Sequence, residues 1–379
     1  MTREEVNNLA LSYIDKSKCL ILELITGYGK TKVAIDLVNH ICDRVFNAYE
    51  QPTSVLILVA KTVHKQTWAN EIEKWGGLKT DYVTIECYES LRKYKNNTFD
   101  VVIMDEVQHL SEARRDILET IKIEEALIGL SATINNDLRN YFRWHYSARF
   151  IKCDLKEAVV DEILPEPTVY LIPLVLDNIR HSYKAKRFKK DVITTQRGYY
   201  NIMSSLIEWY KNKYFNSRRE RIKNLWLSSA GKRLKWLAEQ KEPIVLSLLD
   251  KFKNYKTLTF CSSIEQSERL GKYNITSKNK DSIKNLDMFN NNKIKHITAC
   301  NILNEGVNLT NCRIGIFCNL NSSEIVVKQR VGRILRHKSP IIILPYFKDT
   351  REEELVEKMI EEYSKDSIKI ISNINEIKL

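Results

Sequence analysis

The feature that most constrains this chain is a glycine-rich turn directly behind an apolar run near the N-terminus. Residues 19–25 (Cys-Leu-Ile-Leu-Glu-Leu-Ile) have the composition of a buried strand, and Thr26-Gly-Tyr-Gly-Lys-Thr31 follows without a gap. Glycines allow the backbone to wrap around an anion, and the N–H groups that open the next helix then face it. The pattern therefore predicts an α/β fold with a phosphate-binding loop.

The side chains of this loop favour a nucleoside triphosphate as the ligand. Lys30 is placed to reach the β- and γ-phosphates, and the Thr31 hydroxyl is placed to ligate Mg²⁺. The position of the usual first glycine is Leu24, and a turn that merely joins a strand to a helix uses similar residues, so that alternative stays open on the loop alone. We expect ATP and Mg²⁺ as cofactors. The predicted cradle comprises Thr26, Gly27, Tyr28, Gly29, Lys30 and Thr31.

A second apolar run ends in two adjacent carboxylates. Residues 100–104 (Asp-Val-Val-Ile-Met) precede Asp105 and Glu106. Ligands of parallel sheets gather outside the carboxyl ends of the strands, so Asp105 can hold Mg²⁺ and Glu106 can orient and deprotonate the attacking water. An Asp-Glu pair after a strand can also be a solvated helix start with Asp as its cap.

Hydroxyl side chains follow a third apolar run, residues 126–130. Ser131 and Thr133 come directly after it and can change hydrogen-bond partners when the nucleotide state changes. Together with His109, which follows the carboxylate pair, they are predicted to couple hydrolysis to conformational change.

The far end of the chain offers groups that hydrolysis still requires. A glycine turn contains Gly306 and Asn308, and a helix-like stretch begins at Gln329. Arg333 and Arg336 are three residues apart, so both guanidiniums can point to one developing charge. The alternative is an ordinary basic surface helix.

In this order the motifs resemble those of the superfamily 2 helicases and translocases. Asp105-Glu-Val-Gln-His109 resembles the DExH type, and the segment around Lys61, with Trp68, is similar to that of phage and Swi/Snf-like DNA helicases. The resemblance implies two RecA-like lobes, ATP in the cleft between them and nucleic-acid phosphate contacts across both. The implied contacts are Lys61, Thr62, Ser90, Ser262 and Thr298.

The chain departs from the family pattern at several positions. Its first glutamine is Gln51, so the adenine-reading glutamine that many relatives carry upstream of the loop has no counterpart. Cys300 stands where a threonine usually precedes the second-lobe glycine, and Ala60 replaces the usual proline near Lys61.

The domain organisation follows from alternating strand and helix patterns. The fold class we expect is α/β, with two tandem RecA-like lobes of parallel strands flanked by helices, at residues 1–163 and 164–379. A basic, mostly helical insertion is expected at about 180–250 in the second lobe, and an amphipathic helix from Arg351. The expected strands are 19–25, 54–60, 82–87, 100–106, 126–131, 168–174, 257–262, 294–299, 313–319 and 340–346.

Positive charge is concentrated in one stretch. The chain has 379 residues and a formal net charge of +12, and residues 181–241 carry 16 Lys/Arg against 4 Asp/Glu. Interleaved aromatic residues can stack on bases or pack the helices beneath, so either nucleic-acid binding or a solvated lysine-rich helix face explains the stretch. The predicted phosphate contacts here are Lys186, Arg187, Lys189 and Lys190.

The eight cysteines include no C-x-x-C pair and fall largely within apolar runs, which is typical of reduced thiols. No apolar run approaches membrane-spanning length. We expect a soluble intracellular protein, in the cytoplasm of a bacterium or a virus-infected cell, without membrane partners. The function predicted is an ATP-dependent nucleic-acid motor, and the substrate favoured is DNA. The alternatives are an RNA helicase or remodeller and, more distantly, an ATP-clamped scaffold without productive turnover.

Overall fold

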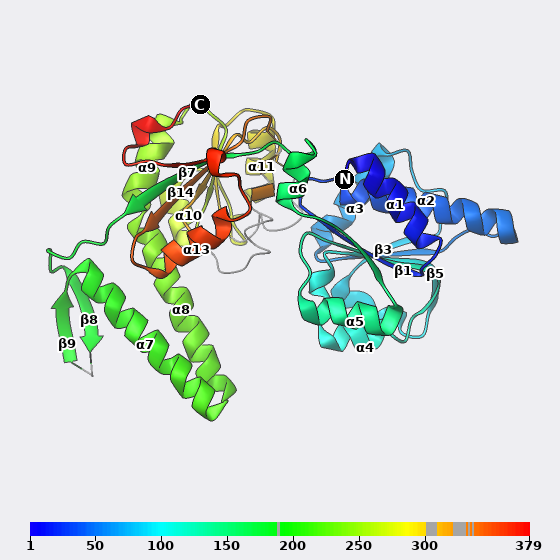
Figure 1. Cartoon of the computed structure of the whole chain (residues 1–379), viewed down its shortest axis with the longest axis horizontal. Coiled ribbons are helices and arrows are strands. Elements are labelled where there is room, and N and C mark those ends of the chain that lie inside the picture. Colours follow the sequence, from blue (N-terminus) through cyan, green and yellow to red (C-terminus); the bar gives the residue numbers. More distant parts are fainter. Residues whose placement is uncertain (188–189, 301–308, 321–330, 333, 336) are drawn as a thin grey trace. The chain divides into compact units, whose positions relative to one another are not determined.

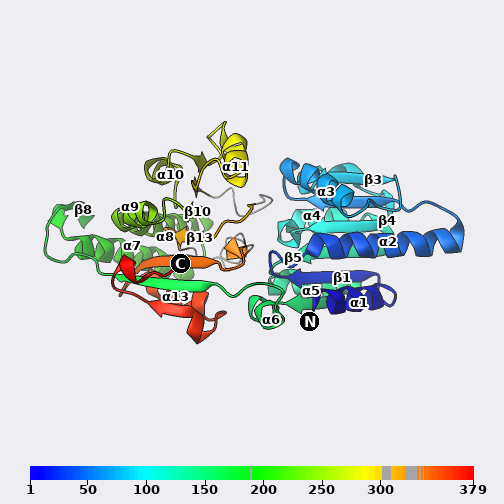
Figure 2. The same ribbon diagram turned by 90° about the horizontal axis from the view of Figure 1, so that it is seen from above.

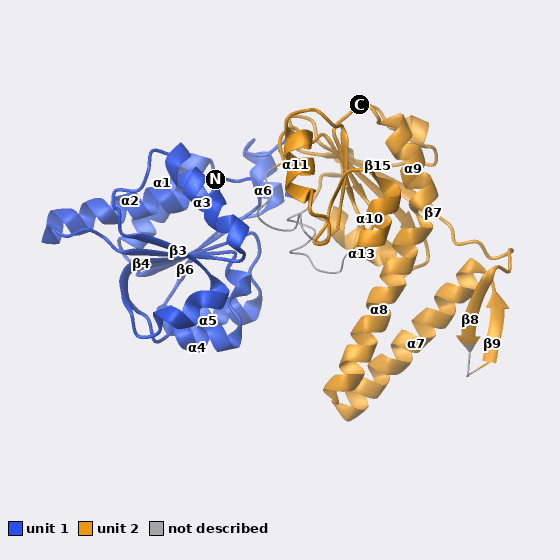
Figure 3. Ribbon diagram, turned by 180° about the vertical axis from the view of Figure 1, so that it is seen from behind, with its two compact units in different colours: residues 1–165, 328–333 blue, residues 166–327, 334–379 orange. Residues whose placement is uncertain are grey.

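The computed structural model describes residues 1–187, 190–300, 309–320, 331–332, 334–335 and 337–379. The chain forms two compact units (Figure 3). Unit 1 comprises residues 1–165 and 328–333, and unit 2 comprises residues 166–327 and 334–379. Each unit has its own parallel sheet.

The sheet of unit 1 has the strand order β3-β2-β4-β5-β1-β6, and every neighbouring pair is parallel (Figure 2). β1 and β2 are buried along their whole length, as expected for a sheet that helices cover on both faces. Figure 1 shows α1, α2 and α3 on one side of the sheet and α4 and α5 on the other. The strands are β1 (Cys19–Leu24), β2 (Val55–Val59), β3 (Val83–Cys87), β4 (Thr98–Asp105), β5 (Lys122–Ser131) and β6 (Arg149–Cys153). The helices are α1 (Arg3–Ile14), α2 (Lys30–Tyr49), α3 (Thr62–Lys74), α4 (Glu112–Leu118), α5 (Asn136–Tyr146) and α6 (Leu155–Val160), with short 3₁₀ helices η1 (Tyr88–Tyr94) and η2 (Val107–His109).

The seven-stranded sheet of unit 2 has the order β11-β12-β10-β13-β14-β7-β15 and is also parallel throughout. Its central strands are apolar and buried from end to end, which gives the core of this unit. The strands are β7 (Thr168–Leu174), β10 (Thr257–Phe260), β11 (Asn274–Ile275), β12 (His296–Ala299), β13 (Ile314–Phe317), β14 (Ile341–Phe347) and β15 (Ile368–Ile370). Helices α9 (Glu242–Lys251), α10 (Ile264–Leu270), α11 (Ser282–Asn290) and α13 (Arg351–Ile360) pack around it.

The structure confirms all ten expected strands and the amphipathic helix from Arg351. The observed strand boundaries agree with the expected ones to within a few residues. It adds β6, β11 and β15, which the sequence did not reveal. β6 lies at a sheet edge and carries Arg149 and Lys152, and β11 and β15 are two and three residues long, so none shows a strand-length apolar run.

The insertion in unit 2 is mostly helical, as the sequence predicts, but it also contains a hairpin that the sequence did not reveal. It begins with an antiparallel hairpin of β8 (Tyr183–Arg187) and β9 (Lys190–Thr194), where β-branched residues such as Val192 and Ile193 favour a strand. Two long helices follow, α7 (Gln196–Ser217) and α8 (Glu220–Gln240). They lie side by side and extend away from the sheet of unit 2 (Figure 1), and we call this pair the arm.

No helix in the described ranges is both long enough and apolar enough to cross a membrane.

Candidate functional site

The glycine loop of unit 1 lies between β1 and α2 and has the backbone conformation that its sequence predicts. Gly27 and Gly29 have φ angles of +95° and +107°, in the region that L side chains rarely adopt. A Cβ added at Gly29 would meet no atom within 4 Å, so the loop is open on that side. Lys30 is the first residue of α2, and its Nζ donates to the Leu24 carbonyl at 2.9 Å. The ammonium group therefore lies over the loop.

The N-terminal segment supports this loop through Tyr28, a contact that no sequence pattern indicated. Tyr28 is fully buried, and its hydroxyl donates to the carbonyl groups of Met1 and Thr2 at 3.2 and 3.1 Å. Arg3 Nε in turn donates to the Tyr28 carbonyl at 3.1 Å. Tyr28 is thus a structural residue of the loop, and its side chain points away from a ligand in the cradle.

Asp105 ends β4, two strand positions from the loop-bearing strand β1 in the sheet order β4-β5-β1. One carboxylate oxygen, Oδ2, accepts from the Trp68 indole Nε1 at 2.9 Å, and the Tyr88 hydroxyl donates to the Asp105 carbonyl at 3.1 Å. Burial and the adjacent Glu106 carboxylate raise the pKa of Asp105 to about 6, while the Trp68 hydrogen bond and the Lys30 ammonium act in the opposite direction. A carboxylate that is costly to ionise when alone is well suited to a cation.

Glu106 takes the left-handed conformation, with φ of +54°, and this places its side chain beside Gln108. The Gln108 amide donates from Nε2 to Glu106 Oε2 at 2.8 Å, and its Oε1 accepts from the Ser131 hydroxyl at 2.8 Å. Thr133 completes the chain, because its backbone N–H donates to Ser131 Oγ at 3.1 Å. Gln108 therefore joins the two segments for which the sequence predicted separate roles.

Two predicted site residues have hydroxyl oxygens that are buried and form no hydrogen bond with the described residues. They are Thr26 Oγ1 in the glycine loop and Thr133 Oγ1 after β5. Buried polar groups are normally paired, so each such atom in a native structure requires an explanation, and a polar ligand at the strand ends supplies one.

A buried ion pair fixes the segment after β5 against β1. Glu23 is 5% exposed, its Oε1 accepts from the Ile134 backbone N–H at 3.2 Å, and its other oxygen pairs with Arg139 of α5. Glu23 lies three residues before the glycine loop and is in register with Ser131. The sequence analysis missed Glu23 and Arg139. The available signal was an acidic residue inside an otherwise apolar strand.

Among the hydrogen bonds of the described residues, none links His109 to the series Glu106, Gln108, Ser131 and Thr133. It ends η2, its carbonyl accepts from Arg114 Nη1 at 2.7 Å, and its ring centroid lies 6.3 Å from that of Tyr88. Its coupling role remains a prediction.

The predicted nucleic-acid contacts lie in different surroundings. Lys61 and Thr62 are exposed at the start of α3, and Ser90 lies half-buried in η1. Ser262 follows β10 and is half-buried; its backbone N–H and its hydroxyl both donate to Gln266 Oε1, at 2.8 and 2.9 Å. Thr298 is fully buried in β12 and donates to the Ser267 carbonyl at 2.8 Å. The structure thus corrects the expectation for Thr298, because a buried and satisfied hydroxyl is not presented to a nucleic acid.

Lys186 and Lys190 are exposed on the β8–β9 hairpin, and Arg187 belongs to β8. The remaining predicted site residues lie outside the described residues: Lys189, Gly306, Asn308, Gln329, Arg333 and Arg336.

Comparison with known proteins now bears on this arrangement. The family model described as the helicase conserved C-terminal domain matches residues 240–338. A relative, the DNA 3'-5' translocase XPB2 of Sulfurisphaera tokodaii, is 23% identical over 87% of this chain and 77% of its own length. The chain is thus similar to helicases at residues 240–338 and to a DNA translocase over most of its length.

Two solved structures share the fold of this chain. The helicase domain of Hef from Pyrococcus furiosus superposes with a TM-score of 0.55 at 13% identity, covering 93% of this chain and 97% of that one. A fragment assigned to an HsdR subunit of a type I restriction enzyme from Vibrio vulnificus gives a TM-score of 0.62 at 18% identity, covering 97% of this chain and 68% of that one. At these identities the likeness establishes the RecA-like fold of the two units.

Proposed function

We propose that this protein is an ATP-dependent motor that acts on DNA and couples ATP hydrolysis to movement along a strand or to its remodelling. The observation that carries the proposal is the meeting of Lys30, Asp105 and Glu106 at the carboxyl ends of β1 and β4, two strands that a single strand separates. Lysine, two carboxylates and a glycine loop at one sheet edge are the groups that phosphoryl transfer requires.

The residues present fit ATP with Mg²⁺. The glycine loop offers backbone N–H groups and the start of a 20-residue helix to a phosphate, and Lys30 lies over it. Thr31 and Asp105 would hold the cation, since oxygen ligands are those that Mg²⁺ prefers, and burial and the adjacent Glu106 raise the pKa of Asp105, a cost that a bound cation would offset. When bound, Mg²⁺ supplies neutralisation of phosphate charge.

Each remaining group then has a chemical task. Glu106 accepts a proton from the attacking water. Gln108 orients the Glu106 carboxylate through the 2.8 Å hydrogen bond from its Nε2 to Glu106 Oε2. Ser131 extends this contact to the segment after β5, so a change of hydrogen-bond partner at Ser131 is transmitted to Glu106. Gln329, Arg333 and Arg336 keep their predicted role of stabilising charge on the transferring phosphate, and Gly306 and Asn308 that of contacting the nucleotide.

DNA is the substrate we favour because a relative that matches most of this chain is a DNA 3'-5' translocase. Lys61, Thr62, Ser90 and Ser262 are the proposed contacts in the two lobes, together with Lys186 and Lys190 on the hairpin. All eight cysteines are buried and outside disulfides, which supports a reducing compartment, the cytoplasm of a bacterium or of a virus-infected cell.

The test is ATP hydrolysis measured in parallel with single-stranded DNA, duplex DNA, forked DNA and RNA. We expect DNA to stimulate hydrolysis, and Glu106→Gln to lower kcat by about 10²- to 10⁴-fold while ATP still binds. Glu112→Gln at the exposed start of α4 is the matched control and should retain activity. Full activity of Glu106→Gln would refute the assignment of the base. Stimulation by RNA alone would replace DNA with RNA, and ATP binding without turnover would indicate a nucleotide-gated clamp.

A further inference from the structure

We propose that the outer part of the arm, residues 209–226, is a contact surface for unpaired nucleic-acid bases, on which exposed aromatic rings stack. We call this segment the arm tip. The inference deepens the proposed function, because the motor's substrate is the partner that it names.

The arm tip exposes aromatic rings that are not needed for packing the two helices. Trp209 is 52% exposed and Phe215 is 48% exposed, although both lie in α7, which packs along α8. Trp209 contacts Tyr210 with a centroid distance of 4.9 Å, and Phe215 belongs to a second cluster with Tyr214 and Trp226. Both clusters leave a ring partly in solvent, where it is available for stacking.

The same segment carries positive charge with little compensation. It contains six Lys/Arg and one acidic residue, Glu220. Lys211 and Lys223 form ion pairs with Glu208 and Glu220. The other four cations form no ion pair with the described residues, and they are Lys213, Arg218, Arg219 and Arg221. Such cations bind nucleic-acid phosphates, and the release of the counterions condensed on those phosphates contributes to the affinity.

Charge and aromatic faces coincide at the arm tip. Lys213 Nζ lies 4.6 Å from the Trp209 ring centroid, and the Arg218 guanidinium lies 5.3 Å from that of Phe215. Each cation lies over one face of its ring, so a base would stack on the opposite face and its phosphates would lie close to that cation. Protein surfaces that bind single-stranded nucleic acid combine aromatic rings with positive charge, because every base has a π-face and every phosphate linkage carries a negative charge.

The charge balance differs where the arm meets the body of unit 2. A cavity of about 1020 Å³ lies there between α7, α8 and the start of α13, and its lining includes only three cations. Five carboxylates also line it: Glu208, Asp349, Glu353, Glu354 and Glu357. The cavity reaches Lys211 and Trp226 of the arm tip but not Trp209 or Phe215, and its carboxylates disfavour phosphates, so a strand is favoured at the latter two rings.

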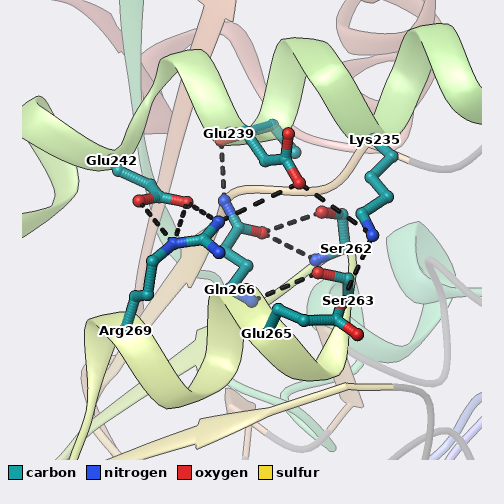
Figure 4. Close-up of polar contacts among 9 residues, drawn as sticks. Lys235, Glu239, Glu242, Ser262, Ser263, Glu265, Gln266 and Arg269 are labelled. Carbon is teal, nitrogen blue, oxygen red and sulfur yellow. Dashed lines mark hydrogen bonds and ion pairs between the residues drawn. The ribbon is translucent and has the colours of Figure 1, made fainter.

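The end of α8 around Ala238, where the arm joins the rest of unit 2, is fixed to the segment that carries Ser262 (Figure 4). Gln266 is fully buried; its Nε2 donates to the Ala238 carbonyl in α8 at 2.8 Å, while its Oε1 accepts from Ser262. Arg269 of α10 pairs with Glu242 at 2.6 Å. A strand held at the arm tip is thereby mechanically joined to a proposed backbone contact of unit 2.

A protein partner explains this surface less well. The cores of protein–protein interfaces are depleted in charged residues, whereas the arm tip carries six Lys/Arg, of which Lys213 lies over the exposed Trp209 ring. We therefore commit to a nucleic acid with unpaired bases. A second copy of this chain is the alternative that the test must separate.

The test uses the full-length protein without nucleotide and a short, fluorescently labelled single-stranded DNA, with blunt duplex and single-stranded RNA in parallel. The double variant Trp209→Ala/Phe215→Ala should bind the single strands about a hundredfold more weakly, because stacking on each of the two rings contributes about tenfold, and should keep its salt slope. Duplex binding should remain at the wild-type level. Trp209→Phe keeps a ring and should bind as wild type.

Two control variants sharpen the comparison. Trp144→Ala removes a tryptophan that is 84% exposed on α5 of unit 1, and it should leave binding unchanged. Arg218→Gln/Arg219→Gln should reduce the slope of log K against log salt by about 0.7 for each single-strand phosphate contact that is lost. The far-UV circular dichroism of all variants should match wild type.

Wild-type affinity of the double variant for single strands would overturn the proposal, as would an equal loss on blunt duplex. A concentration-dependent dimer in sedimentation that the double variant abolishes would assign the surface to a second copy instead. The outcome is separable from that for the motor: oligonucleotide binding without nucleotide tests the arm tip, whereas ATP turnover at saturating DNA tests the proposed function.

Discussion

The ionisation cost of Asp105 predicts that Asp105→Asn stabilises unit 1 in the absence of metal and nucleotide. Asparagine has the same shape and keeps an oxygen that can accept from the Trp68 indole at the 2.9 Å position. It removes a carboxylate whose pKa is raised by burial and by Glu106 from 3.8 to about 6. The substitution therefore removes a cost and leaves the neighbouring contacts in place.

The magnitude and its pH dependence follow from linkage. Because the folded pKa of Asp105 exceeds the unfolded one, the folded state binds more protons between these values, and wild-type stability falls as pH rises through this window. The difference between the two pKa values lowers the free energy of unfolding of the wild type by about 3 kcal/mol above pH 7. The loss is roughly half as large at pH 5 and vanishes well below pH 4. The advantage of Asp105→Asn should grow with pH in that proportion.

Native-state hydrogen exchange of the β4 and β5 amides measures the free energy of unfolding of unit 1 by itself, and so the stability difference between the variant and the wild type. The experiment requires EDTA and no nucleotide, at pH 5 and pH 8, with Asp116→Asn in α4 as a matched control outside the site. Addition of Mg²⁺ and ATP should reverse the order, because only the wild type gains a cation ligand. An advantage that is absent or that does not change with pH would refute the assignment of a buried, uncompensated carboxylate.

Two further predictions concern other parts of the described structure. Gln108→Leu removes the amide between Glu106 and Ser131 and should lower kcat about tenfold, with little change in the KM for ATP, because it disorients a general base; an unchanged kcat would leave Gln108 as a structural residue. Lys241→Met should destabilise unit 2 by about 3–5 kcal/mol in urea denaturation, since Lys241 and Glu352 are 0% and 1% exposed and joined at 2.6 Å, and the substitution leaves Glu352 buried without its cation. Replacing both residues with methionine should recover most of that loss, and failure to do so would indicate that packing, not charge, is the cause.

The sequence alone was sufficient for the architecture because parallel strands buried on both faces read as continuous apolar runs. β1, β2 and β14 are examples, and each was predicted within two residues. The hairpin of β8 and β9 was not predicted, since its charged, half-exposed residues give no apolar run. The edge strand β6 was missed for the same reason.

For the site, the sequence determined which groups are present and that strand ends would carry them: the glycines of the loop, Lys30, Asp105 and Glu106. Only the tertiary structure decided which of them contact one another. The Trp68–Asp105 and Gln108–Ser131 hydrogen bonds join residues 37 and 23 positions apart, and the Glu23–Ile134 contact spans 111. Such partners depend on the strand order β4-β5-β1, and strand order is set by packing of whole elements, which local periodicity does not encode.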